Sequence, residues 1–150
     1  MRIALFEPEI AQNVGAVLRL GACFGAAVDL IEPMGFEWDD RRVRRTAMDY
    51  IDHVHVVRHA DFDAFRDAIG EQRLILFTTK GSQSAYDFRF RADDVLLFGK
   101  ESAGVPPAVA DACDARVRIP IRAFVRSFNL ATSAALALGE ALRQTGTLPD

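Results

Sequence analysis

The sequence predicts an α/β fold, in which a mainly parallel sheet of six strands carries helices on both faces. Short apolar segments alternate with segments of helical periodicity along the whole chain, which is typical of βαβ units. Small or polar residues follow several of the apolar segments, where strands give way to helices. With 150 residues, half of them hydrophobic, and no Pro/Gly/Ser-rich linker, a single domain over residues 1–150 is expected.

The amino-terminal part is predicted to begin with a buried strand, Arg2–Phe6, because this segment is mostly apolar. A helix over Val14–Phe24 follows, since apolar side chains repeat there at helical spacing and Asn13 is a residue type that caps helices. Gly25 ends this helix, and the apolar segment Ala27–Ile31 forms the second strand.

The middle of the chain is predicted to contain a loop over residues 32–40, a short Arg-rich helix and two further strands. The third strand is Val54–Val57, where β-branched residues are frequent. Asp61 caps a helix that runs to about Ile69, and Leu74–Thr78 is the fourth strand.

The carboxyl-terminal part contributes the last two predicted strands, Asp93–Phe98 and Arg116–Ile121. Pro106 suits the first turn of a helix between them. A final helix runs from Ser127 to about Gln144, because small apolar residues repeat there every three to four positions.

Composition and charge restrict the possible functions. The net charge of −3 argues against a nonspecific nucleic-acid binder, and DNA is not an expected partner. Cys23 and Cys113 stand far apart without a neighbouring His, so neither a disulfide framework nor a metal site is predicted. No apolar stretch reaches the roughly 18 residues that a spanning helix needs, so no membrane partner is expected and the localisation is predicted to be cytoplasmic.

Two segments are candidates for ligand binding. Gly99 and Gly104 bracket four residues directly after a predicted strand, where glycine allows a sharp turn or a close approach to a ligand. Neither a dinucleotide fingerprint nor a phosphate-binding P-loop motif is present. Ser127 and Asn129 flank Phe128 at the expected start of the last helix, where they either cap the helix or bind a ligand.

An Arg-rich run is the candidate RNA-binding surface. Arg41, Arg42 and Arg45 belong to this run, and the aromatic residues Phe36, Trp38 and Tyr50 lie near it in the sequence. Single-stranded RNA is held by arginines on its phosphates and aromatic rings on its bases. The alternative is a solvent-exposed charged helix without a ligand.

Three sequence blocks stand out: Glu7–Gly15, Leu97–Gly104, and Ile119–Ile121 followed by Arg126–Leu130. Together they resemble the SPOUT superfamily of AdoMet-dependent RNA ribose 2′-O-methyltransferases. Further segments resemble the minimal single-domain members that modify the wobble nucleotide of tRNA: Ile31–Arg42, Asp49–Tyr50 and Thr78–Gly81.

The resemblance implies methyl transfer from S-adenosyl-L-methionine (AdoMet) to the ribose 2′-hydroxyl of nucleotide 34, a cytidine or 5-substituted uridine, in the tRNA anticodon loop. It also implies a deep trefoil knot in the carboxyl-terminal part and a homodimer. Two alternatives remain open: methylation of ribosomal RNA or of another tRNA position, and a non-catalytic knotted RNA-binding module.

The resemblance also assigns site residues by position. Those expected to line AdoMet are Phe77, Gly99, Gly104, Ile119, Ile121, Ser127 and Leu130. Those expected around the methyl acceptor are Asn13, Arg19, Glu101 and Asn129. Because a guanidinium rarely gives up its proton, Arg19 is expected to clamp a phosphate, with proton removal shared by phosphate, water or Glu101.

Overall fold

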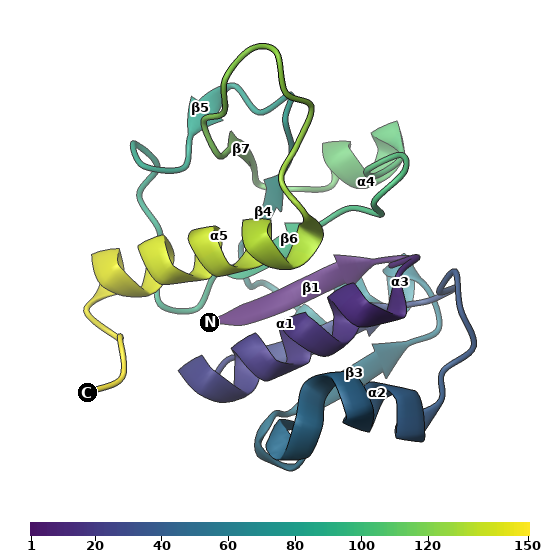
Figure 1. Ribbon diagram of the computed structural model, residues 1–150. Coiled ribbons are helices and arrows are strands. Elements are labelled where there is room, and N and C mark those ends of the chain that lie inside the picture. Colours follow the sequence, from purple (N-terminus) through teal and green to yellow (C-terminus); the bar gives the residue numbers. More distant parts are fainter.

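A single parallel sheet of seven strands organises the protein. The computed structural model describes the backbone of residues 1–150 and the side chains of residues 1–45 and 49–150. The strand order is β3-β2-β1-β6-β4-β7-β5, and every named pair is parallel (Figure 1). The strands are β1 Arg2–Phe6, β2 Ala27–Ile31, β3 Val56–His59, β4 Leu74–Phe77, β5 Gln83–Ser84, β6 Val95–Phe98 and β7 Ala115–Arg118.

Helices cover both faces of this sheet. The helical elements are α1 Ala11–Phe24, α2 Asp40–Ala47, the 3₁₀ helix η1 Met48–His53, α3 Phe62–Ile69, α4 Pro107–Asp111 and α5 Leu130–Thr145. On one face α1 packs between α2 and α5, whereas α3 and α4 belong to the apolar core of the other face (Figure 1). The predicted α/β class with helices on both faces is therefore confirmed.

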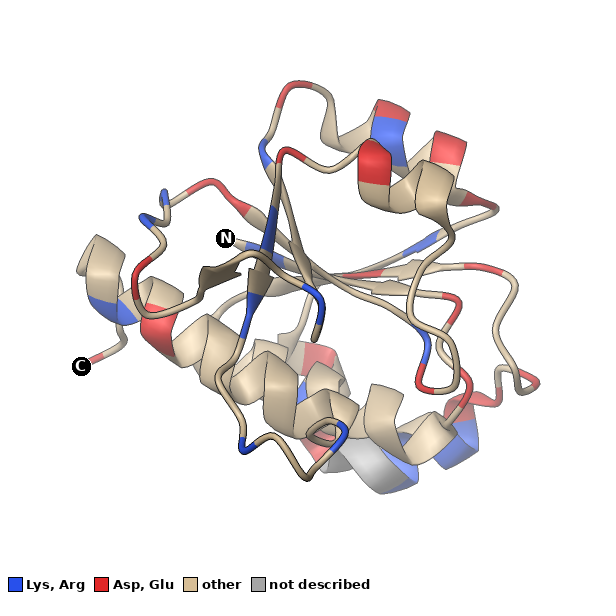
Figure 2. Ribbon diagram, turned by 90° about the horizontal axis from the view of Figure 1, so that it is seen from above, with Lys and Arg blue, Asp and Glu red and all other residues tan. Residues whose placement is uncertain are grey.

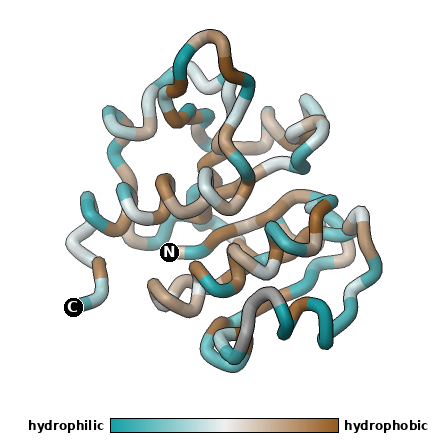
Figure 3. Tube along the Cα trace, viewed as in Figure 1, coloured by the Kyte–Doolittle hydropathy of each residue, from teal (hydrophilic) through white to brown (hydrophobic). Residues whose placement is uncertain are grey.

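Successive side chains of β1 point to opposite faces of the sheet and so belong to two separate apolar cores. Ile3 and Leu5 pack with α1 and α5, whereas Ala4 and Phe6 face the other way toward α3. The central strands β1, β4 and β6 are among the most hydrophobic parts of the chain, whereas α2 is one of the most hydrophilic (Figure 3). Since central parallel strands are covered on both faces, they contain almost continuous apolar sequence.

The prediction of six strands is wrong, because the sheet has a seventh strand, β5. This strand has only two residues, and it is defined by its pairing with β7 rather than by an apolar pattern of its own. The last predicted strand is also too long, since β7 ends at Arg118 rather than at Ile121.

Two predicted helix starts differ from the structure. Helix α1 begins at Ala11, and its N-cap is Ile10 rather than Asn13, whose buried side chain bonds to residues of other segments. Helix α5 begins at Leu130 rather than at Ser127, and Asn129 is its N-cap. Asn129 accepts the backbone N–H groups of the two residues after Leu130, as its residue type predicts.

The chain between β4 and β6 wraps around β7. Strand β4 pairs with one edge of β7 and β5 pairs with the other, so the intervening residues 78–82 cross over β7. The crossing is close: a Cβ atom at Gly81 would lie 2.4 Å from the carbonyl carbon of Val117. The Arg118 side chain donates to the carbonyls of Gly81 and Ser82 at 3.0 and 2.9 Å. Only glycine allows the two backbones to approach in this way.

We expect Gly81→Ala to lower the free energy of unfolding by about 1–3 kcal/mol, because the added methyl group overlaps the Val117 backbone. The matched control is Gly139→Ala in α5, where an added Cβ meets nothing within 4 Å. Because alanine favours a helix more than glycine does, this control should raise stability by up to about 1 kcal/mol. Urea denaturation of both variants checks the prediction, and equal effects would contradict the close crossing.

Candidate functional site

Loops at one edge of the sheet bring the candidate site residues together. Strands β1, β6, β4 and β7 are neighbours and parallel, so their carboxyl ends lie along the same edge. Ligands of open α/β sheets bind outside these carboxyl ends. The loops after β1 and β6 meet there.

Two carboxylates tie these loops to each other. The Glu101 carboxylate accepts the backbone N–H groups of Glu9 at 2.9 Å and of Ile10 at 3.3 Å. In return, the Glu9 carboxylate accepts the backbone N–H of Ser102 at 2.8 Å and its hydroxyl at 2.7 Å. Helix α1 has no side-chain cap from Ile10, so Glu101 supplies negative charge at its N-terminus from another segment. Glu9 and Ser102 were not among the predicted site residues, although they lie in the blocks Glu7–Gly15 and Leu97–Gly104.

An ion pair and a tight turn complete the connection. Lys100 Nζ lies 2.7 Å from Glu7 Oε2, and this hydrogen bond raises the pKa of the Lys100 ammonium above its ordinary value. The backbones of Lys100 and Gly104 exchange two hydrogen bonds, and Gly104 has a φ of +65°. A Cβ at Gly99 would lie 2.4 Å from the carbonyl carbon of Gly104, so both glycines are required by the turn itself.

A chain of amides connects Glu101 to the last helix. The Asn13 side-chain amide donates to Glu101 Oε1 at 3.1 Å, and its oxygen accepts the Asn129 amide at 2.8 Å. Asn129 Oδ1 accepts the backbone N–H groups that begin α5, so its NH₂ group is the one that donates to Asn13. These hydrogen bonds fix the orientation of both side-chain amides. The structure thus brings together three of the four residues predicted around the methyl acceptor.

Arg19, the fourth, lies outside this cluster within the same chain. It is exposed on α1, with its guanidinium carbon 4.9 Å from the centroid of the Tyr50 ring. Arg19 is six positions after Asn13, which corresponds to about 9 Å along the helix axis and a different side of the helix.

The residues predicted to line AdoMet lie at adjacent strand ends, in the loops after β6 and β7, and at the start of α5. Phe77 ends β4, its ring stacks on Phe98 with centroids 5.0 Å apart, and Gly99 follows Phe98 directly. Leu130 is buried in the same core as Phe77, and Ile119 packs against it. Ile121 and Ser127 lie in the loop between β7 and α5, where Ile121 is partly buried and Ser127 is exposed.

The Arg-rich helix lies next to the loop after β1. Arg41, Arg42 and Arg45 are exposed, and the cationic residues of α2 lie at the periphery of the molecule (Figure 2). A groove of about 540 Å³ is lined by Arg42 and Arg45 on one side and by residues 9–12 on the other. Glu9 lines this basic groove and also bonds to Glu101. The groove therefore leads to the cluster formed by Glu101, Asn13 and Asn129, which we call the Glu101 cluster.

Comparison with known proteins gives the family. The model of the SpoU rRNA Methylase family matches residues 1–139. The chain belongs to the SpoU methylase family. A tRNA (cytidine(34)-2′-O)-methyltransferase of Beijerinckia indica is 54% identical over 148 residues, which cover 97% of this chain and 92% of the relative. The enzyme of the same name from Escherichia coli K12 is 42% identical, with 97% and 94% covered.

Solved structures of SpoU methylases and their relatives have the same fold. One, described as giving insights into the 2-OH methylation of C/U34 on tRNA, aligns with a TM-score of 0.91 at 40% identity and covers 95% of this chain and 94% of its own. The SpoU methyltransferase AviRb from Streptomyces viridochromogenes, in complex with AdoMet, aligns with a TM-score of 0.83 at 26% identity. That alignment covers 96% of this chain and 57% of AviRb. Among the described residues, no helix combines the length and apolar composition needed to cross a bilayer.

The hydrogen bonds between the Glu9 carboxylate and Ser102 should depend on pH. The hydrogen bonds from Ser102 lower the pKa of the Glu9 carboxyl below its ordinary value of 4.5. The stabilisation is therefore fully present above pH 4.5 and is lost as the pH falls through the lower pKa of the folded state. We expect protection of the Ser102 amide against hydrogen exchange, measured by NMR, to fall in this acidic range.

Glu9→Gln should remove this transition and reduce the protection already at neutral pH, since the neutral amide is a weaker acceptor than the carboxylate. Glu71→Gln is the control, because Glu71 is exposed before the amino end of β4. An acid transition that persists in Glu9→Gln would assign it to another group.

Proposed function

We propose that this protein transfers the methyl group of AdoMet to the ribose 2′-hydroxyl of the wobble nucleotide, cytidine or uridine 34, in the tRNA anticodon loop. The observation that carries the proposal is the 54% identity, over nearly the whole length of both chains, to a tRNA (cytidine(34)-2′-O)-methyltransferase. The hydrogen bonds that join Glu101, Asn13 and Asn129 support the proposal, because they form a polar site at the sheet edge where ligands of α/β proteins bind.

The adjacent strand ends fit AdoMet chemically. Phe77, Ile119, Ile121 and Leu130 offer apolar surface for an adenine ring, and Gly99, Gly104 and Ser127 would lie around the rest of the molecule. Among the described residues, one backbone hydrogen bond forms within the loop 119–128, so most peptide groups there are available to the edges of a ligand. When bound, AdoMet supplies a methyl group on a positively charged sulfur, which is a good leaving group.

The task of the protein is then to position the ribose oxygen in line with the methyl carbon, an effect worth about 7–11 kcal/mol in favourable cases. Glu101 already accepts three hydrogen bonds, so we assign it the positioning of Asn13 and the α1 N-terminus rather than proton removal. Asn13 and Asn129 orient the acceptor ribose. The Arg19 guanidinium holds the adjacent phosphate, which leaves water or phosphate to take the proton.

We also propose a homodimer in which Arg19 completes the site of the second subunit. Its position outside the Glu101 cluster supports this arrangement. The loop between β7 and α5 exposes Phe124 at 80%, Val125 at 46% and Phe128 at 40%, which supports burial of this loop against AdoMet or the second subunit.

A deep trefoil knot and a cytoplasmic location complete the proposal. The crossing of residues 78–82 over β7 supports the knot, because the chain there encloses the strand that leads to the carboxyl-terminal helix. In α5, the Gln144 side chain accepts the Phe90 backbone N–H at 3.1 Å, which ties the last helix to the same segment. The location follows from the tRNA substrate.

The test of the reaction is transfer of label from methyl-labelled AdoMet to unmodified tRNA, followed by nuclease digestion and mass spectrometry. We expect a 2′-O-methylated nucleotide at position 34. Label confined to ribosomal RNA or to another tRNA position would contradict nucleotide 34 as the methylation site and would identify the labelled position as the target. AdoMet binding without any transfer would indicate a non-catalytic RNA-binding module.

The exposed arginines of α2, two of which line the basic groove, should bind the tRNA phosphates. We expect Arg41→Ala combined with Arg45→Ala to weaken tRNA binding, and to reduce the slope of log K against log salt by roughly 1.5, since each phosphate contact contributes about 0.7–0.9. The matched control is Arg89→Ala with Arg91→Ala, an equal charge change at exposed positions before the amino end of β6. AdoMet affinity should stay unchanged in both variants, and equal salt slopes for both would contradict the assignment.

A further inference from the structure

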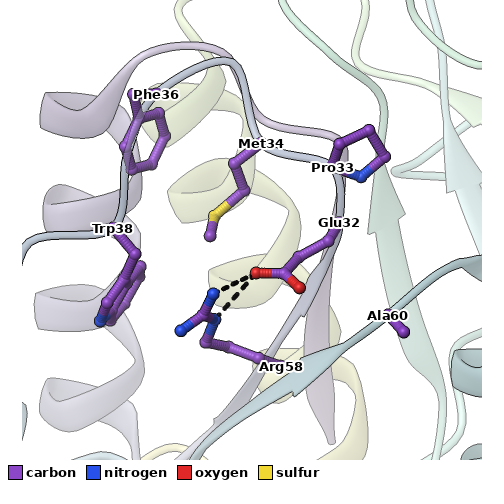
Figure 4. A pocket seen from close by; sticks show the side chains of 7 residues that line it. All are labelled: Glu32, Pro33, Met34, Phe36, Trp38, Arg58 and Ala60. Atoms are coloured by element: carbon purple, nitrogen blue, oxygen red, sulfur yellow. Dashed lines mark hydrogen bonds and ion pairs between the residues drawn. The ribbon is translucent and has the colours of Figure 1, made fainter.

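A second cleft lies beyond the basic groove, where β2 and β3 end. It has a volume of about 380 Å³, and Figure 4 shows the side chains around it. The lining residues are Glu32, Pro33, Met34, Phe36, Trp38, Arg58 and Ala60. Neither the polar cluster nor the AdoMet residues contribute to it.

The chemistry of this cleft suits a flat, neutral ring. Phe36, Met34 and Trp38 form its apolar walls, and the guanidinium carbon of Arg58 lies 5.3 Å from the centroid of the Trp38 ring. Bases of single-stranded RNA stack on aromatic rings and on guanidinium planes. The Trp38 ring is itself held, since its Nε1–H donates to Asp40 at 2.8 Å.

The polar groups of the cleft suit the edge of a base and disfavour a phosphate. Arg58 donates through Nε and a terminal nitrogen to one Glu32 oxygen, Oε1, in a pair whose two charges cancel. Among the described residues no donor bonds to Oε2, so this oxygen is available to an amino group on a ligand (Figure 4). Carboxylates accept hydrogen bonds from exocyclic amino groups of bases, whereas they repel phosphate.

The cleft lies next to the basic groove that we propose to bind the RNA phosphates. Phe36 lines both this cleft and the basic groove of Arg42 and Arg45, so one ring separates the two. Two strand spacings, about 10 Å, separate the β1/β6 boundary at the polar cluster from the β2/β3 boundary at the cleft. Neighbouring nucleotides of one strand span such a distance.

We propose that this cleft binds the base of an anticodon-loop nucleotide that flanks the methylated one, a base with an exocyclic amino group. The phosphates of that segment follow Arg42 and Arg45, and the base enters past Phe36. The proposal deepens the proposed function and rests on it for the identity of the RNA. It assigns Glu32, Trp38 and Arg58 to substrate selection rather than to the chemical step.

The experiment uses the fact that Trp38 is the only tryptophan of the chain. An unmodified anticodon stem-loop is titrated into the full-length protein, and tryptophan fluorescence and the affinity of the labelled RNA are both recorded. A series of stem-loops, each with one loop nucleotide made abasic, is titrated in the same way. We expect the RNA to quench Trp38, and one abasic position next to nucleotide 34 to abolish the quench and weaken binding roughly tenfold.

Protein variants test whether the base at the sensitive RNA position binds in the cleft. Trp38→Ala should weaken binding of the intact stem-loop by a similar factor and have no further effect on the RNA with that one abasic position, while Trp38→Phe retains most of the affinity. Glu32→Leu should remove the preference for a base with an amino group over uracil at that position. Tyr86→Ala is the matched control, because Tyr86 is an exposed aromatic residue beside β5 at the opposite end of the sheet. AdoMet affinity verifies that each variant is folded.

The outcomes separate this proposal from the proposed function. Methylation at position 34 together with additive effects of Trp38→Ala and every abasic site would overturn the base-binding cleft and leave the reaction intact. A quench that is insensitive to all abasic sites would also overturn it. A base-dependent quench without methylation at position 34 would support the cleft and reject the proposed reaction.

Discussion

The reciprocal hydrogen bonds of Glu9 and Glu101 hold the candidate site in place. They join loops from the adjacent strands β1 and β6, and each carboxylate satisfies backbone donors of the opposite loop. Backbone N–H groups at a helix start and in a tight turn otherwise lack partners. Removing either carboxylate therefore frees two segments at once, and the Asn13–Asn129 connection to α5 depends on the same geometry.

The candidate functional regions follow the strand order of the sheet. The candidate AdoMet residues lie at or after the ends of β6, β4 and β7, up to the start of α5. The polar cluster lies between β6 and β1, and the cleft with Trp38 lies at β2 and β3. The basic groove connects the cluster with the cleft through Glu9 and Phe36. One edge of a parallel sheet thus presents the proposed cofactor, acceptor and RNA-binding groups in sequence, because all its strands end on the same side.

Much of this arrangement could be predicted from residue patterns. The strands Arg2–Phe6 and Ala27–Ile31 agree with the structure at both ends, because continuous apolar runs bounded by polar residues identify buried parallel strands. The cap functions of Asp61 and Asn129 were also predictable, since their side chains bond to backbone groups two or three residues further along the chain. The prediction that Asn13 caps α1 was wrong, because among the described residues its side chain does not bond to nearby backbone groups. Its partners, Glu101 and Asn129, are distant in the sequence.

The sequence by itself determined the fold class, the family and the identity of most candidate site residues, because apolar periodicity and short motifs are local properties of the chain. Only the tertiary structure decided where those residues meet. It placed Glu9 beside Ser102, Arg19 over Tyr50 rather than near Glu101, and Glu32 and Arg58 in one cleft with Trp38. It also formed β5, a strand of two residues that exists through its pairing with β7. Each of these features depends on contacts between separate segments, and those contacts form only when the sheet brings the segments together.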